Sequence, residues 1–103
     1  MRGDIYRLQA PRNATGHEQA GRRYAIEVQG FANLSTVVVV PTSTKARPAL
    51  YRPAIEMDGT TTRVLVEQIT AVDLDRLGEM VGRLSPQEMA EVDAALRLLL
   101  GLH

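Results

Sequence analysis

The chain has 103 residues, of which 45% are hydrophobic and 23% are charged, with 12 basic and 12 acidic side chains. This length predicts one domain over residues 1–103 with a modest core, and a domain of this size gains stability by dimerising. The sequence has no cysteine and two histidines, which excludes disulfides, thiol catalysis and cysteine-based zinc sites and argues against a histidine metal centre.

The sequence contains neither a membrane span nor a recognisable targeting segment. No stretch approaches the roughly 18 consecutive apolar residues of a transmembrane helix, and no apolar leader follows Met1. We therefore expect a cytoplasmic protein without a membrane partner.

The charged residues are unevenly distributed along the chain. Residues 1–52 contain eight basic and three acidic side chains, a net charge of +5, whereas residues 53–103 contain four and nine, a net charge of −5. One part of the folded protein can therefore face a polyanion although the whole chain is neutral.

The first half of the chain is predicted to form short strands separated by polar loops. A strand over residues 2–8 is followed by a loop of about a dozen residues, and a loop of this length is often functional. In the next strand, alternation places Tyr24 on the apolar face and Arg23 on the opposite face. Residues 36–40 are apolar on both faces, which is typical of a central, buried strand.

The second half of the chain is predicted to add three strands. The pattern indicates a loop over residues 45–53, an edge strand over 54–57, a hairpin turn at Asp58-Gly59, a strand over 62–69, a single helical turn over 72–77 and a strand over 79–84. Six short strands indicate a mainly β fold, which is a small and strongly bent sheet or barrel with a helix attached.

A C-terminal helix has the clearest sequence signals. Ser85-Pro86-Gln87-Glu88 is a capping box with proline at the first helical position, and Gly101 can end the helix. The predicted apolar stripe consists of Met89, Val92, Leu96 and Leu99. Three leucines that lie off this stripe either pack on a partner or are buried within the monomer: Leu98, Leu100 and Leu102.

Two segments place phosphate-binding chemistry at strand ends. Arg22 and Arg23 lie where the long loop becomes a strand, so the backbone can hold a guanidinium in place. Thr42, Ser43 and Thr44 follow the buried apolar run and bring three hydroxyls to its end. A planar cation beside hydroxyl donors suits a phosphate group. The chain has no glycine-rich phosphate loop, which disfavours a nucleotide enzyme.

Four motifs occur in an order and spacing that resemble those of the MazF/PemK (Kid) toxin family over nearly the whole chain. They are Arg2-Gly3-Asp4-Ile5-Tyr6, Glu18-Gln19-Ala20-Gly21-Arg22-Arg23, Val38-Val39-Val40-Pro41-Thr42-Ser43 and Glu67-Gln68-Ile69. The resemblance implies an SH3-like β-barrel of about six strands with short helices and a C-terminal helix, assembled as a homodimer.

The same resemblance implies a function. It predicts the toxin of a type II toxin-antitoxin system, a metal-independent endoribonuclease without cofactors that cuts single-stranded RNA at a short motif. The products would carry 2′,3′-cyclic phosphate and 5′-hydroxyl ends, and the cleavage would inhibit translation and growth. The implied protein partner is a cognate antitoxin whose disordered C-terminal segment covers the active cleft.

The resemblance also assigns candidate site residues. The family's catalytic arginine falls on Arg23, and its catalytic threonine falls on Ser43, where Thr42 or Thr44 could serve instead. The predicted RNA-binding residues are Gln19, Arg22, Thr44, Lys45, Arg47 and Gln68, and Arg52 is expected to line the RNA path beside Lys45 and Arg47.

Three positions leave alternatives open. Glu18 could accept a hydrogen bond from the RNA 2′-hydroxyl or from a base amino group, or it could pair with a neighbouring arginine. Tyr24 stands where the family usually has proline, which leaves the orientation of Arg23 less constrained. His17 is either a general base or a solvated loop residue.

These departures keep two other functions in view. One is a non-catalytic toxin that resembles the CcdB type and acts by binding, and the other is a degenerate paralogue that binds an antitoxin but cuts RNA poorly. The combination of Arg23 with Ser43 favours cleavage over the first, whereas the changes at Tyr24 and Ser43 keep the second open.

Overall fold

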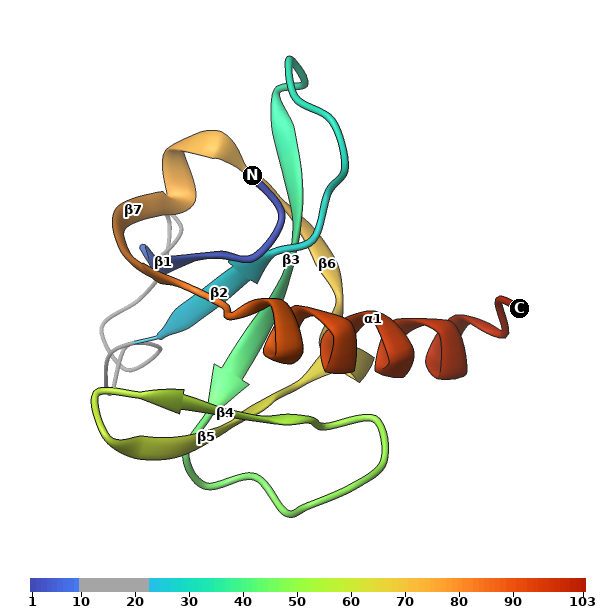
Figure 1. Cartoon of the computed structure of the whole chain (residues 1–103). Helices are drawn as coiled ribbons and strands as arrows, with labels where there is room; N and C mark the ends of the chain where they lie inside the picture. Colours follow the sequence, from blue (N-terminus) through green and yellow to red (C-terminus); the bar gives the residue numbers. More distant parts are fainter. Residues whose placement is uncertain (10–22) are drawn as a thin grey trace.

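The computed structural model describes residues 1–9 and 23–103, and in them seven strands form a curled antiparallel sheet (Figure 1). The strand order is β4-β5-β3-β2-β1-β7, and β6 pairs with β3 beside this path. No helix in these residues is long and apolar enough to cross a membrane. The elements are β1 (Asp4–Leu8), β2 (Tyr24–Glu27), β3 (Thr36–Ser43), β4 (Ala54–Met57), β5 (Thr60–Val64), the 3-10 turn η2 (Val66–Gln68), β6 (Thr70–Asp73), the 3-10 turn η3 (Leu74–Arg76), β7 (Leu77–Arg83) and α1 (Pro86–Leu100).

Strand β3 is central because it pairs with three other strands. It pairs with β2 on one side, and on the other side with β6 along its first half and with β5 at Thr42 and Ser43. Pro41 lies where the pairing changes from β6 to β5, and its carbonyl accepts from the Leu65 N–H (2.8 Å). The N–H that proline lacks would point to the same interrupted edge, so no ladder hydrogen bond is lost. The predicted buried strand over residues 36–40 is confirmed, and it continues to Ser43.

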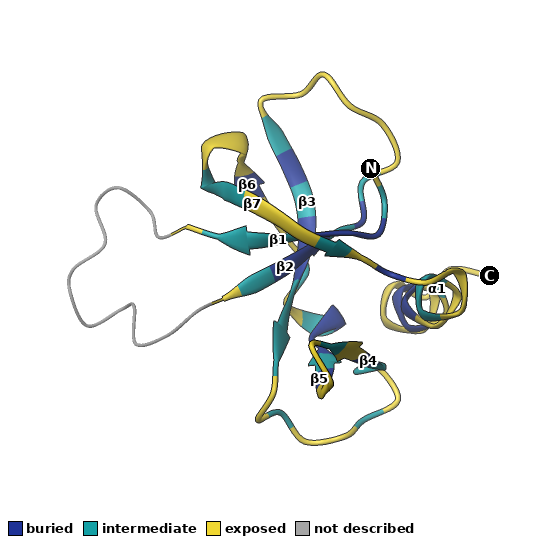
Figure 2. Cartoon of the chain, turned by 60° about the vertical axis from the view of Figure 1, so that its left-hand side comes forward, coloured by how far each residue is buried: buried dark blue, intermediate teal, exposed yellow. Residues whose placement is uncertain are grey.

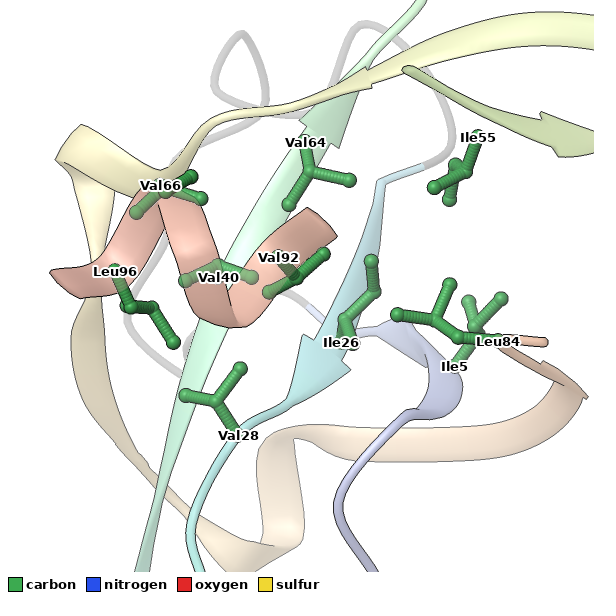
Figure 3. Packing of buried hydrophobic residues seen from close by; sticks show 11 residues of the cluster. Ile5, Ile26, Val28, Val40, Ile55, Val64, Val66, Leu84, Val92 and Leu96 are labelled. Carbon is green, nitrogen blue, oxygen red and sulfur yellow. The ribbon is translucent and has the colours of Figure 1, made fainter. Parts of the chain in front are cut away.

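Two hydrophobic clusters lie on opposite faces of the sheet, as side-chain alternation along the strands requires. The larger cluster lies between the sheet and α1 (Figure 3) and contains Ile5, Ile26, Val28, Val40, Ile55, Val64, Val66, Leu84, Val92, Ala95 and Leu96. The smaller cluster contains Ala25, Val37, Val39 and Val72. Each large aliphatic side chain that is fully buried contributes about 1.5–3 kcal/mol. Because β3 contributes valines to both clusters, it is held from both faces.

Helix α1 begins and ends as the sequence predicts. The Ser85 hydroxyl accepts from the Glu88 N–H (3.1 Å), and the Glu88 carboxylate accepts from the Ser85 N–H (2.9 Å). These two hydrogen bonds confirm the capping box. Gly101 ends the helix with a left-handed φ of 69°. Figure 2 shows α1 end-on, with buried residues on one side and exposed residues on the other.

The buried stripe of α1 differs from the predicted one toward the C-terminus. Val92 and Leu96 are buried as expected, but Leu99 is 38% exposed and Ala95 is buried instead. Three further leucines of this end are more than half exposed, namely Leu98, Leu100 and Leu102. The alternative in which they are buried within the monomer is therefore wrong, and the end of α1 projects past the sheet (Figure 1).

The prediction of one strand over residues 62–69 is wrong. Strand β5 ends at Val64, η2 follows, and β6 begins at Thr70. Leu65 and Val66 are buried although they lie outside the strands, so this apolar run imitates a buried strand in the sequence. The predicted helical turn over 72–77 is shorter and corresponds to η3, and the last strand begins at Leu77. The sheet therefore has seven strands where six were predicted.

Candidate active site

A cleft of about 550 Å³ opens where the ends of three strands face a hairpin. Figure 1 shows the start of β2, the end of β3 and the β4–β5 hairpin on the same side of the molecule, at the lower left. The strand ends provide part of the lining, namely Leu8, Arg23, Tyr24 and residues 41–45. The hairpin provides Met57, Asp58, Thr60 and Thr62. Leu65 and Gln68 complete the lining.

Arg23 lines the cleft and directly precedes β2. Its carbonyl accepts a hydrogen bond from the Leu8 N–H (2.8 Å), which ties the backbone of Arg23 to the end of β1. The side chain is exposed, and no carboxylate in residues 1–9 or 23–103 forms a salt bridge with it. A guanidinium on a fixed backbone can bind a phosphate through two parallel hydrogen bonds.

The three hydroxyl residues at the end of β3 line the cleft together with Lys45. Thr42 Oγ1 donates to the Tyr24 carbonyl (3.4 Å), whereas Ser43 Oγ accepts from the Lys45 N–H (3.1 Å). A hydroxyl has one proton and two lone pairs. The Ser43 proton is therefore available to a bound anion, whereas the Thr42 proton is directed toward the protein backbone. This difference makes Ser43 the better donor to a phosphate oxygen.

The β4–β5 hairpin forms the opposite wall, which we did not predict from the sequence. Asp58 and Gly59 have φ values of 51° and 76°, as a two-residue hairpin turn of type I′ requires, and the predicted turn is confirmed. Ser43 of β3 pairs with Arg63 of β5, and this pairing brings the hairpin to the end of β3. Turn chemistry locates a hairpin in the sequence, but it does not indicate which distant strand the hairpin will join.

Gln68 lines the cleft from η2, so the expectation that it ends a strand is wrong. The neighbouring Glu67 holds this turn, because its Oε2 accepts from Arg52 Nε (2.9 Å) and from Arg52 Nη2 (2.6 Å). Hydrogen bonding to Arg52 lowers the pKa of Glu67 below its ordinary value. The other carboxylate oxygen of Glu67 is buried and has no hydrogen-bond partner in the described part of the chain.

Arg52 also anchors the loop between β3 and β4. Its Nη1 donates to the Arg47 carbonyl (3.3 Å), and its own carbonyl accepts from Arg63 Nη1 (3.1 Å). Arg52 is thus bonded to the protein and is not among the residues that line the cleft, and its place along the RNA path stays a prediction. Arg47 is exposed and also lies outside the lining.

The structure brings six of the predicted site residues into one cleft, namely Arg23, Thr42, Ser43, Thr44, Lys45 and Gln68. Tyr24 also lines the cleft and packs against the larger hydrophobic cluster. Glu18, Gln19 and Arg22 lie outside the described residues, as does His17. The roles assigned to all of these residues stay predictions.

Known proteins resemble this chain over its whole length. The family described as PemK-like, MazF-like toxin of type II toxin-antitoxin system matches residues 1–100. The Mycobacterium tuberculosis protein Rv3098A is 44% identical over 104 positions, covering 99% of this chain and 98% of the relative. Endoribonuclease MazF of Staphylococcus saprophyticus is 32% identical over 111 positions, covering 99% of this chain and 92% of the relative.

Solved structures agree with this relationship. A mycobacterial endoribonuclease in complex with its cognate antitoxin has a TM-score of 0.81 and 25% identity, covering 100% of this chain and 96% of that chain. MazF of Deinococcus radiodurans has a TM-score of 0.76 and 25% identity, covering 97% of this chain and 94% of that chain. These matches confirm the predicted fold class, a small and mainly β, SH3-like half-barrel with a C-terminal helix. Sequence motifs, fold and family match coincide over nearly all residues, and the chain belongs to the PemK-like, MazF-like toxins of type II toxin-antitoxin systems.

Proposed function

We propose that this protein is the toxin of a type II toxin-antitoxin system and an endoribonuclease that cuts single-stranded RNA at a short motif. The observation that carries the proposal is the meeting of Arg23, Ser43 and Thr42 in one open cleft. Relatives named as endoribonucleases support it. The enzyme would act in the cytoplasm as a single domain over residues 1–103, and RNA cleavage would inhibit translation and growth.

The cleft residues suit a reaction in which RNA supplies its own nucleophile. The 2′-oxygen attacks the adjacent phosphorus, the bond from phosphorus to the 5′-oxygen breaks, and the products are a 2′,3′-cyclic phosphate and a 5′-hydroxyl. The proton lost by the 2′-hydroxyl passes to a base, and the leaving 5′-oxygen takes up a proton. Because no external nucleophile has to be activated, the protein has to position the phosphate and stabilise its developing charge.

Each residue in this proposal has a role that follows from its donors. Arg23 binds the phosphate and stabilises the pentacoordinate state, since a guanidinium keeps its protons and is a poor acid. Ser43 donates to a non-bridging oxygen, and Thr42 assists. Glu18 is the candidate acceptor for the 2′-hydroxyl proton. Thr44, Lys45 and Gln68 would contact the RNA inside the cleft, with Gln19, Arg22 and Arg47 extending the path beyond it.

Two protein partners complete the proposal. The cleft is open and carries Arg23 and Lys45, so an extended antitoxin segment that covers it would block RNA. The structure of a mycobacterial endoribonuclease has been solved in complex with its cognate antitoxin, which supports such a partner. We also propose a homodimer, which the exposed leucines at the end of α1 support.

The test is incubation of the purified protein with a long single-stranded RNA in EDTA, followed by mapping of the new ends. We expect discrete cuts with cyclic phosphate and 5′-hydroxyl ends. Arg23→Ala should lower the rate by at least roughly 10²–10³-fold, the usual effect of losing a donor to developing charge, without changing the melting curve.

Arg47→Ala is the matched control, because it removes the same charge from an exposed position outside the cleft lining. We expect it to lower the rate less than about tenfold, as the loss of one peripheral phosphate contact would. Full activity of Arg23→Ala would refute the proposed site. Failure of the wild-type protein to cut diverse RNAs would instead favour a toxin that acts by binding or a degenerate paralogue that binds an antitoxin.

A further inference from the structure

The two walls of the cleft differ in charge. Arg23 and Lys45 belong to the strand-end wall, and Asp58 belongs to the hairpin wall, where it is the one acidic side chain among the described lining residues. Asp58 is exposed and takes part in none of the five salt bridges found in residues 1–9 and 23–103. A phosphate held by Arg23 would be repelled by this carboxylate, which favours an RNA backbone that follows the strand-end wall and a different chemical group at Asp58.

The conformation of the turn accounts for the residue type only in part. Asp-Gly suits a two-residue hairpin turn because both residues adopt positive φ, and Asn-Gly suits it equally well. A turn therefore needs Asp or Asn at this position, but it does not need a negative charge. The charge is left to act on whatever occupies the cleft.

The residues around Asp58 are suited to a nucleobase. Thr60, Thr62 and Gln68 bring polar groups to the same cleft, and Met57 brings an apolar side chain. Thr62 is buried and its Oγ1 donates to the Thr60 carbonyl (3.3 Å), so the acceptors that a base can reach on this wall are on the exposed Asp58, Thr60 and Gln68 side chains. Acceptors beside an apolar surface match a base that presents N–H donors on its edge and a flat face.

We propose, on the basis of the ribonuclease function proposed above, that Asp58 selects guanine as the base of the nucleotide next to the scissile phosphate. The N1–H and N2–H groups of guanine lie side by side and match the two carboxylate oxygens of Asp58. Cytosine and adenine each offer one amino group on their Watson–Crick edges, and uracil places carbonyl oxygens on both sides of its single N–H. A site built to accept two hydrogen bonds rejects bases that cannot donate them, because its acceptors are then left unpaired.

The experiment compares the wild-type protein with Asp58→Asn, which keeps the favoured turn but replaces one acceptor by a donor. Asp75→Asn is the matched control, because it removes the same charge from an exposed acid outside the cleft lining. Cleavage of a randomised RNA first identifies the bases that flank the cut. Oligonucleotides with guanine, inosine, adenine, cytosine or uracil at that position are then compared by kcat/KM, since inosine lacks only the N2 amino group.

For the wild-type protein and Asp75→Asn we expect guanine to be preferred over uracil by roughly 5- to 150-fold, the range for one bidentate base contact. The kcat/KM for the inosine substrate should lie between the values for the guanine and uracil substrates. Asp58→Asn should lose the preference, so that its kcat/KM values for the guanine and uracil substrates become similar. A motif without guanine beside the cut, or an Asp58→Asn variant that accelerates cleavage of every sequence equally, would overturn the inference.

Binding separates this inference from the proposed activity. Oligonucleotides with a 2′-deoxy sugar at the attacking position cannot be cut, and their affinity can be measured by fluorescence anisotropy. Wild-type protein that prefers guanine over inosine here, with the preference lost in Asp58→Asn, supports the role of Asp58 even if no RNA is cleaved. Cleavage by a wild-type protein whose guanine preference survives in Asp58→Asn would retain the ribonuclease and refute the role of Asp58.

Discussion

The hydroxyls at the end of β3 differ in how their protons are used. Ser43 Oγ accepts from the Lys45 N–H, whereas Thr42 Oγ1 donates to the Tyr24 carbonyl. Neighbouring residues with the same functional group therefore present different chemistry to the cleft. The proximity of Ser43 to Thr42 and Thr44 in the sequence left three candidates for one role, and the hydrogen-bond partners rank Ser43 above Thr42.

This ranking predicts the effect of removing the hydroxyl of Ser43 or of Thr42. Ser43→Ala should lower the single-turnover cleavage rate by roughly 10²-fold, because it removes a donor to the developing charge. Ser43→Thr should retain most of the rate, whereas Thr42→Val should cost less than about tenfold. Measurement of all three with one mapped oligonucleotide checks the prediction. A larger loss in Thr42→Val than in Ser43→Ala would assign the catalytic hydroxyl to Thr42.

At the scale of elements, the cleft depends on a turn and a loop that are tied together. Arg52 of the loop after β3 binds Glu67 of η2, and η2 carries Gln68 into the cleft. The carboxylate of Glu67 and the guanidinium of Arg52 are each 23% exposed. The pair is thus partly shielded from solvent, which weakens screening of their attraction. We infer that it keeps Gln68 in place.

The pair makes stability depend on pH in a defined direction. Hydrogen bonding to Arg52 lowers the folded-state pKa of Glu67 below its ordinary value of 4.5. The stabilisation is therefore fully present above about pH 4.5 and is lost as the pH falls through the lower folded-state pKa. Glu67→Gln should lower the melting temperature at pH 7, and the difference from the wild type should narrow at pH 3.

Glu91→Gln is the control for that measurement, because Glu91 is exposed on α1. Its melting temperature should follow that of the wild type at both pH values by circular dichroism. An equal difference between the wild type and Glu67→Gln at pH 7 and pH 3 would show that packing, and not the charge of Glu67, is responsible.

Elements with local signals were predictable from the sequence, and elements set by distant contacts were not. Three such elements are the capping box at Ser85, the Asp58-Gly59 turn and the buried run of β3, and each is specified by a few consecutive residues. Residues 65–68 were assigned to a strand because buried apolar residues look alike in a strand and in a turn. The hairpin wall of the cleft escaped prediction because it depends on pairing between β3 and β5.

At the scale of the whole molecule, folding rearranges the charge asymmetry of the sequence. Within residues 1–9 and 23–103, three salt bridges join the basic first half to the acidic second half, namely Arg2–Asp93, Asp4–Arg83 and Arg52–Glu67. Two arginines of the first half are therefore neutralised by the second half. The net charge of +5 over residues 1–52 overstates the surface that can attract RNA. Among the described lining residues Arg23 and Lys45 remain as cations, so they concentrate the attraction at the proposed site.

The proposed homodimer predicts a role for the projecting end of α1. A groove of about 420 Å³ lies beside this end, and its lining combines apolar residues such as Val28, Leu96, Leu100 and Leu102 with Arg2, Asp93 and Arg97. Leu100→Glu would replace an apolar side chain by a carboxylate that has to be desolvated when the contact forms, which costs several kcal/mol. We therefore expect it to weaken dimerisation more than tenfold.

Sedimentation equilibrium of the wild type, Leu100→Glu and Leu50→Glu checks this prediction. Leu50 is 87% exposed on the loop after β3. Leu50→Glu is the matched control, since it adds the same charge away from the groove. Leu50→Glu should dimerise as the wild type does. A wild-type protein that remains monomeric at all concentrations would refute the dimer, whereas a Leu100→Glu variant that dimerises normally would place the interface elsewhere. Because α1 packs on the sheet through Val92, Ala95 and Leu96, a charge at Leu100 leaves the monomer core intact, and the change in mass reports on association.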